Sequence, residues 1–161
     1  MAARWGLGRR RSCSAGDLAS SVDNGGVSTP ALPFLDAPAL ARLAETAGGT
    51  VPCAICASLA CPGWESLPGA FDRRGLQAVA TLRPAGEEEK TLQEHHPDGT
   101  DLWSPEAPIA PAFFPYNRCE VWICTGCGRP FLHYTEYGGY YQEERLRELR
   151  PGLVSEASPG T

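Results

Sequence analysis

Long apolar runs are missing from this 161-residue chain, and so are the features that mark an exported protein. Its hydrophobic stretches fall far short of the roughly 18–20 residues that a membrane-spanning helix needs. The basic residues Arg9–Arg11 lead into a small, polar segment, whereas a secretory signal would continue with an apolar core. We therefore expect a cytoplasmic protein that does not associate with a membrane.

Lysine is almost absent as well, since Lys90 is the only one among 14 basic residues, which oppose 19 acidic ones. Without Arg4 and Arg9–Arg11 the chain has 10 basic and 19 acidic residues, a net charge of −9. Binding along a nucleic-acid backbone needs a basic surface, so this balance argues against a nucleic-acid partner. The 18 glycines and 15 prolines exclude a long helical bundle or a coiled coil.

The length of the chain suits one domain with a tail at each end. Residues 1–30 are small and polar and show no apolar period, so a disordered arm is predicted there. Residues 31–152 are predicted to form a single small α+β domain. A disordered tail is predicted for residues 153–161.

One helix and one strand are predicted in the first half of this domain. A helix is predicted over Leu35–Ala47, because Asp36 is suited to cap it and Pro38 is acceptable in its first turn. A strand is predicted over Leu76–Leu82, where apolar and β-branched residues cluster.

Turn and breaker residues dominate the middle of the chain. Pro97–Gly99 is a turn signal between the runs 91–96 and 100–103, which predicts a β-hairpin. The prolines of Ser104–Pro115 exclude a regular element and predict an extended segment over the surface.

The last third of the chain is predicted to be the most structured. Cys119–Cys124 alternates like a strand, and Phe131–Glu136 is predicted as the return strand. After Gly138 and Gly139, the good helix formers of Tyr141–Leu149 predict a short helix.

Seven cysteines are prominent in a chain without an export signal, where thiols stay reduced and disulfides are not expected. Four of them form two C-x-x-C pairs, Cys53 with Cys56 and Cys124 with Cys127. Two intervening residues allow both sulfurs of a pair to face one ion, and zinc prefers four tetrahedral thiolate or imidazole ligands. These four cysteines are therefore predicted to share one structural zinc ion.

The segment Cys124–Gly128, which reads Cys-Thr-Gly-Cys-Gly and is followed by Phe131, resembles the knuckle of zinc-ribbon domains. The resemblance covers Cys119–Tyr137 and implies a zinc-ribbon-like β-hairpin with a ligand pair at its tip, flanked by short helices. The gap of 67 residues between the two pairs exceeds the roughly 15–20 of compact sites, which leaves their pairing open. The stretches Cys61–Phe71 and Phe114–Tyr141 also resemble small uncharacterised bacterial proteins, a resemblance that implies no activity.

Other ligand sets remain open. With Cys61 the first pair extends to C-x₂-C-x₄-C, and with Cys119 the second extends to C-x₄-C-x₂-C, so the two clusters are mirror images in spacing. Either extra cysteine could replace one of the four predicted ligands. The second cluster also has the spacing of three ligands in plant-type ferredoxins, so an iron–sulfur cluster is an alternative. His95, His96 and His133 are further candidate ligands.

Catalytic interpretations have weaker support. Pro52–Cys56 matches half of the zinc deaminase signature, but the H-x-E half is missing. A thioredoxin-like C-x-x-C pair would need a βαβ context, and a closed four-cysteine site leaves no open position for substrate. No catalytic residue is assigned, and a metal-dependent hydrolase or thiol-redox protein is kept as the alternative.

Nine of the 14 aromatic residues lie between Phe113 and Tyr141, more than one small hairpin can bury. Tyrosine and tryptophan are favoured in protein interfaces because they combine a large area with a polar tip. They can also stack nucleobases, but the acidic body weakens that interpretation. We therefore expect a non-enzymatic zinc-binding module that binds or regulates another protein through its aromatic C-terminal region.

Overall fold

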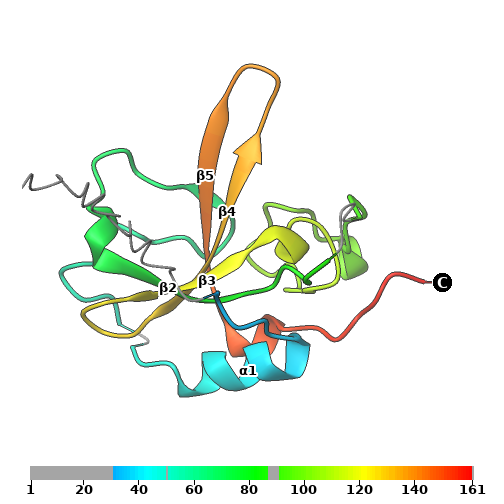
Figure 1. The fold of residues 1–161 in the computed structure, drawn as a ribbon, viewed down its shortest axis with the longest axis horizontal. Helices are drawn as coiled ribbons and strands as arrows, with labels where there is room; N and C mark the ends of the chain where they lie inside the picture. The colour runs from blue at the N-terminus through cyan, green and yellow to red at the C-terminus, as the bar shows by residue number, and fades with distance from the viewer. Residues whose placement is uncertain (1–30, 50, 87–90, 161) are drawn as a thin grey trace, which may run out of the picture. The chain divides into compact units, whose positions relative to one another are not determined.

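The structure is a computed structural model that describes residues 31–49, 51–86 and 91–160. The arm predicted for residues 1–30 lies outside these ranges and stays a prediction. An antiparallel sheet of five strands, in the order β1-β5-β4-β3-β2, forms the centre of the described part of the chain (Figure 1). Its strands are β1 (Glu65–Ser66), β2 (Leu76–Thr81), β3 (Glu120–Cys124), β4 (Pro130–Tyr137) and β5 (Gln142–Glu148).

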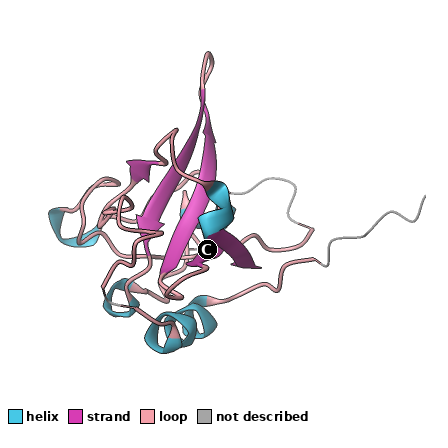
Figure 2. Cartoon of the chain, turned by 90° about the vertical axis from the view of Figure 1, so that its left-hand side faces the viewer, coloured by secondary structure: helices cyan, strands magenta, loops and turns pink. Residues whose placement is uncertain are grey.

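The helix α1 (Ala37–Thr46) is the one α-helix within the described ranges. Short 3₁₀ turns accompany it: η1 (Arg73–Gly75), η2 (Pro97–Gly99), η3 (Tyr116–Arg118) and η4 (Pro151–Leu153). Figure 2 shows how much of the described chain outside the sheet runs as loops. The predicted α+β class is confirmed in this coarse form, with more sheet than helix.

The start of α1 follows the predicted capping pattern. Asp36 accepts a hydrogen bond from the Ala39 N–H at 2.9 Å, and Pro38 lies in the first turn, where no backbone N–H is needed. Leu40 and Ala44, four residues apart, are the buried side chains of the helix. None of the helices among the described residues combines the length and the apolar character that crossing a membrane demands.

The strand β5 occupies the residues for which a helix was predicted, so the helix over Tyr141–Leu149 is wrong. β5 pairs with β4 along its whole length, and the Arg145 Nε–H donates to Glu136 across the pair at 2.8 Å. Leu146 and Arg147 then point to opposite faces of the sheet, and both are buried. This pairing outweighs helix preferences of a few tenths of a kcal/mol per residue.

The β-hairpin predicted around Pro97–Gly99 is also wrong, because the described residues on either side form no strands. The turn itself exists as η2. The residues before it bond elsewhere: the Phe114 N–H donates to the Gln93 carbonyl at 2.9 Å, and the Asn117 side-chain amide donates to the Thr91 carbonyl at 2.9 Å. The run that was expected to pair across the turn therefore pairs with the proline-containing segment.

The segment Ser104–Pro115 contains no helix or strand, as its prolines predict, but its predicted place over the surface is wrong. Ile109 and Phe113 are buried. The Ile109 N–H donates to the Leu153 carbonyl at 2.7 Å, and the Ser155 N–H donates back to the Ile109 carbonyl at 2.9 Å. These bonds tie residues beyond position 152 to the segment.

Buried side chains of the described residues gather in two clusters, one on each face of the sheet. Along β3 and β4, Val121 and Leu132 face one cluster, whereas Cys124 and Phe131 face the other. The aromatic core comprises Leu40, Ala44, Trp64, Ala80, Leu82, Ile109, Tyr116, Cys119, Val121, Leu132, Tyr134 and Leu149. The cysteine core comprises Cys56, Leu59, Cys61, Leu76, Cys124, Phe131 and Leu146.

Candidate metal centre

The four cysteines of the two C-x-x-C pairs meet at one place in the structure. Cys53 and Cys56 lie in the loop that follows α1, Cys124 ends β3, and Cys127 lies in the turn before β4. Their four Sγ atoms all lie within 4.8 Å of one another. The long gap between the pairs therefore does not keep them apart, because loop closure becomes only slowly more costly with length.

Three of the six separations between the sulfur atoms match the edges of a tetrahedron around a single ion. The Cys53 Sγ lies 3.9 Å from that of Cys56 and 3.6 Å from that of Cys124, and the Cys56 Sγ lies 3.7 Å from that of Cys127. A tetrahedron with metal–sulfur bonds of about 2.3 Å has edges of about 3.8 Å. A disulfide would need a separation of about 2.05 Å, so these thiols are not paired in that way.

Backbone hydrogen bonds shape both turns around the sulfurs. In the β3–β4 turn the Gly128 N–H donates to the Cys124 carbonyl at 2.8 Å, and the Cys124 N–H donates to the Arg129 carbonyl at 2.9 Å. Gly128 has a φ of +73°, the left-handed conformation that glycine adopts without strain, as the knuckle pattern implied. The Cys56 N–H donates to the Cys53 carbonyl at 3.1 Å and closes the other turn.

Gly126 allows the two turns to pack against each other. A Cβ atom at this position would lie 2.9 Å from the Ile55 Cδ1 and 3.1 Å from the Cys53 Sγ, which leaves no room for a side chain. The neighbouring Thr125 N–H donates to the Gly75 carbonyl at 3.0 Å and fixes the turn against the start of β2. The sequence indicated a turn here but not this close approach, which depends on tertiary packing.

The thiols differ in their tendency to ionise. Backbone N–H groups of Cys56 and Ile55 donate to the Cys53 sulfur and lower the pKa of that thiol to about 6. Burial raises the pKa of Cys56 to about 12. A deprotonated Cys56 therefore needs a nearby cation, and a metal ion shared by the four sulfurs would provide it.

Arg129 places a second positive group beside the cysteines. Its Nε–H donates to the Glu148 carboxylate at 3.0 Å, and its buried Nη1 has no partner among the described residues. Desolvation lowers the pKa of Arg129, but Glu148 and, more weakly, Cys56 raise it above its ordinary value overall. A buried guanidinium next to Cys56 suits a four-thiolate centre, whose net charge is negative. No sequence motif singles out Arg129, although it directly follows the knuckle.

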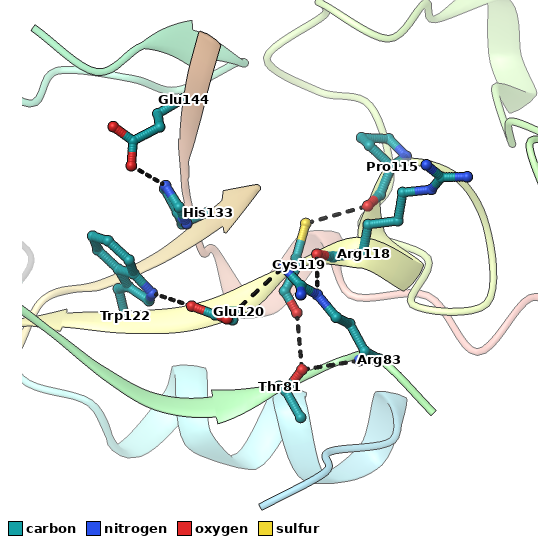
Figure 3. Close-up of polar contacts among 9 residues, drawn as sticks. All are labelled: Thr81, Arg83, Pro115, Arg118, Cys119, Glu120, Trp122, His133 and Glu144. Carbon is teal, nitrogen blue, oxygen red and sulfur yellow. Dashed lines mark hydrogen bonds and ion pairs between the residues drawn. The ribbon is translucent and has the colours of Figure 1, made fainter. Parts of the chain in front are cut away.

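The two other candidate cysteines lie outside this cluster. Cys61 is buried in the cysteine core, and its Sγ–H donates to the Leu59 carbonyl at 3.5 Å. Cys119 belongs to the aromatic core on the opposite face, and its Sγ–H donates to the Pro115 carbonyl at 3.4 Å (Figure 3). Burial raises the pKa of both thiols, which disfavours the thiolate form that a metal would bind.

The histidines are engaged elsewhere as well. The His95 ring stacks on Phe113, with 4.8 Å between centroids, and His96 faces Glu94. The His133 Nε2 lies 3.2 Å from the Glu144 carboxylate (Figure 3). The group of potential ligands found among the described residues therefore consists of the two C-x-x-C pairs.

The arrangement is suited to holding one thiophilic ion in a closed site. Four thiolates complete a tetrahedron and leave no open position for water or substrate. In an iron–sulfur cluster at least some of the four cysteines bind different iron atoms, and the sulfurs on different irons lie well beyond the 4.8 Å that contains all four sulfurs here.

Comparisons of the chain with models of protein families, with curated proteins and with solved structures found no match in any of the three.

Proposed function

We propose that the protein is a non-enzymatic protein-binding module, stabilised by one structural zinc ion that Cys53, Cys56, Cys124 and Cys127 hold. The spacing of 3.6–3.9 Å between neighbouring sulfurs carries the metal part of the proposal. Zinc prefers four such ligands and has no redox chemistry. The burial of Cys56 and Cys124 supports a closed structural site rather than a catalytic one.

A structural ion at this position would supply folding free energy directly. It would join the loop after α1 to the β3–β4 turn, so that two segments far apart in sequence share one centre. Such ions contribute about 10–16 kcal/mol of apparent binding free energy in small zinc domains. The β3–β4 hairpin, with one ligand pair at its turn, supports the zinc-ribbon-like interpretation.

The protein-binding part of the proposal is supported by exposed aromatic side chains in the C-terminal half. Tyr137, Tyr140 and Tyr141 are exposed near the turn between β4 and β5, and Trp103 is 47% exposed. Aromatic residues of this kind often provide much of the binding energy in protein interfaces.

Elemental analysis of the purified protein, with native mass spectrometry of the same sample, tests the metal part. One zinc per chain is expected, together with loss of zinc in Cys53→Ser and Cys124→Ser. Cys61→Ala is the matched control, because Cys61 is buried but lies outside the cluster. It should retain the zinc.

Two results would overturn this assignment. Stoichiometric iron in place of zinc would keep the site but change the ion, since a four-thiolate tetrahedron also suits iron. A metal-free protein whose thiols disappear in pairs under mild oxidant would favour the thiol-redox alternative.

A further inference from the structure

The β4–β5 ribbon extends beyond the rest of the sheet (Figure 1). β4 pairs with β3 only over Pro130–His133, whereas its pairing with β5 continues to Tyr137. Beyond His133, no strand of the described chain pairs with β4 on the edge opposite β5, and no backbone bond from a loop reaches that edge. Because the Glu144 carbonyl bonds to Leu67 on the far side of β5, the Thr135–Glu144 pair is not hydrogen-bonded. The backbone groups of Thr135 and Tyr137 therefore point to the free edge, whereas those of Tyr134 and Glu136 bond to β5. This part of β4 therefore presents unpaired strand backbone, to which an extended peptide can add.

The other edge of the ribbon is partly covered. β1 pairs with Arg145 and Leu146 of β5, and the Leu67 N–H donates to the Glu144 carbonyl at 2.8 Å. Only the outermost residues of β5 lack such a neighbour within the described chain. The longer unpaired edge belongs to β4.

One of the tyrosines at the tip, Tyr141, is held in place by the turn. Gly138 lies directly under the Tyr141 ring, since a Cβ atom there would lie 2.3 Å from a ring carbon. The Gly138 N–H donates to the Tyr141 carbonyl at 2.9 Å, and the Tyr141 hydroxyl donates to Glu136 at 3.2 Å. Tyr137 is 76% exposed, and Tyr140 is fully exposed. The Tyr141 ring, which these contacts order, loses little conformational entropy when a partner binds.

The charge of the ribbon favours a basic partner. Between Tyr134 and Arg145 the sequence has three glutamates and a single arginine, and the whole chain carries a net charge of −5. Arg145 bonds to Glu136 at 2.8 Å and to Glu143 at 2.7 Å, and Arg73 pairs with Glu144, so two arginines face three carboxylates and a negative surplus remains. The faces of exposed tyrosine rings also attract guanidinium and ammonium groups.

We propose that the free edge of β4, formed by the backbone groups of Thr135 and Tyr137, together with the exposed tyrosines of the tip, binds an extended arginine- or lysine-rich segment of a partner protein as an added strand. This inference rests on the proposed protein-binding function and names the class of partner. The main-chain bonds of β4 would provide affinity for an extended backbone. The tyrosines and glutamates would select basic side chains.

The test uses the zinc-loaded full chain and a short synthetic peptide in which arginine alternates with threonine. The peptide is expected to bind and to slow amide hydrogen exchange at Thr135 and Tyr137, whose N–H groups point to the free edge. A peptide with glutamate in place of arginine should not bind, because the charge is reversed. A peptide with proline in place of threonine keeps the charge but cannot pair as a strand, and it should also fail.

Variants of the protein define the surface. Tyr137→Ala is expected to weaken binding of the arginine peptide about fivefold, the size of a cation–π contact at an exposed site. Leu92→Ala is the matched control, because it removes another exposed apolar side chain, outside the ribbon, and should leave binding unchanged.

Four outcomes would overturn the inference: unchanged exchange at Thr135 and Tyr137, equal binding of the proline peptide, equal binding of the glutamate peptide, or a dimer of the free chain that protects the same amides. Zinc content and circular dichroism of the same sample separate this failure from loss of the metal centre. A photo-crosslinker at Tyr140 that captures a neutral or acidic peptide would contradict the basic partner but preserve the protein-binding function.

Discussion

The two faces of the sheet are stabilised in different ways. On one face the aromatic core combines α1 with tightly packed rings, among them Trp64 edge-on to Tyr134 with 4.9 Å between centroids. On the other face the cysteine core is smaller, and four thiols cluster at its end. One face therefore depends on packing, and the other depends on the proposed ion.

A buried arginine lies at each core, and the two arginines differ in whether a carboxylate pairs with them. Arg129, beside the cysteine core, is paired with the carboxylate of Glu148. Arg147, in the aromatic core, has no carboxylate partner among the described residues and donates to the Ala107 carbonyl at 2.6 Å and to the Tyr116 hydroxyl. The first arginine balances charge near the thiols, whereas the second binds the loops that cover the sheet.

Removal of the ion should have the largest effect on the stability of the cysteine face. Chelation, Cys124→Ser or Cys127→Ser is expected to unfold the domain, because the metal contribution of about 10–16 kcal/mol exceeds or equals the stability of a typical domain. Circular dichroism and thermal melting measure the loss. Cys119→Ala, a change to a buried thiol of the aromatic core, should keep the fold. An unchanged melting temperature after chelation would contradict the structural role.

Equal truncations on the two faces sharpen the comparison. Leu132 faces the aromatic core and Leu146 the cysteine core, and both are almost completely buried. Leu132→Ala and Leu146→Ala should each lower the free energy of unfolding of the zinc-loaded protein by about 2–5 kcal/mol. Urea denaturation measures both changes. If Leu146→Ala lowered the free energy of unfolding by less than about 1 kcal/mol, the ion and not side-chain packing would stabilise the cysteine face.

Arg147→Met tests the role of Arg147, the buried arginine that has no carboxylate partner among the described residues. The change removes the donors to Ala107 and Tyr116, and unpartnered buried acceptors cost about 1–3 kcal/mol. A lower urea midpoint is therefore expected, with partial recovery in Arg147→Lys. Equal or higher stability of Arg147→Met would show that the desolvated charge outweighs its hydrogen bonds.

The smallest effect concerns pH on the cysteine face. Burial holds the pKa of His133 below its ordinary value of 6.5, and Glu144 offsets this only in part. The unfolded chain then binds a proton more readily, so stability is full above pH 6.5 and falls as the pH drops towards the folded pKa. His133→Gln should flatten this slope in pH-dependent urea denaturation. His95→Gln serves as the control, and an unchanged slope in His133→Gln would contradict the assignment.

The parts of the fold that were predicted from sequence depend on local chemistry. The cap of α1 at Asp36 and the turn at Gly128 follow from neighbouring residues alone. The meeting of the two cysteine pairs followed from the ligand preference of zinc. By contrast, β5 was predicted as a helix because its helix formers conceal a face alternation at Leu146 and Arg147, which only the pairing with β4 reveals.

The other misassigned regions also depend on distant partners. The run before Pro97–Gly99 lacks a strand because its carbonyls accept bonds from residues of the 114–117 region. The burial of Ser104–Pro115 follows from the bonds of Ile109 to the C-terminal end and from the donors of Arg147. No pattern in the residues themselves indicates these contacts.

The long connection between Cys56 and Cys124 has a consequence for the unfolded chain. An ion that stayed bound to both pairs in the denatured chain would act as a cross-link that closes a loop of 67 intervening residues, and its stabilising effect would then be the lost chain entropy rather than the full binding free energy. The chain-entropy treatment predicts that a cross-link of this length lowers the entropy of the unfolded chain, which corresponds to a free energy of about 4 kcal/mol at 25 °C. Unlike a disulfide, this cross-link opens when the thiolates are protonated or a chelator competes for the ion. The availability of free metal would then set how widely the denatured chain can expand.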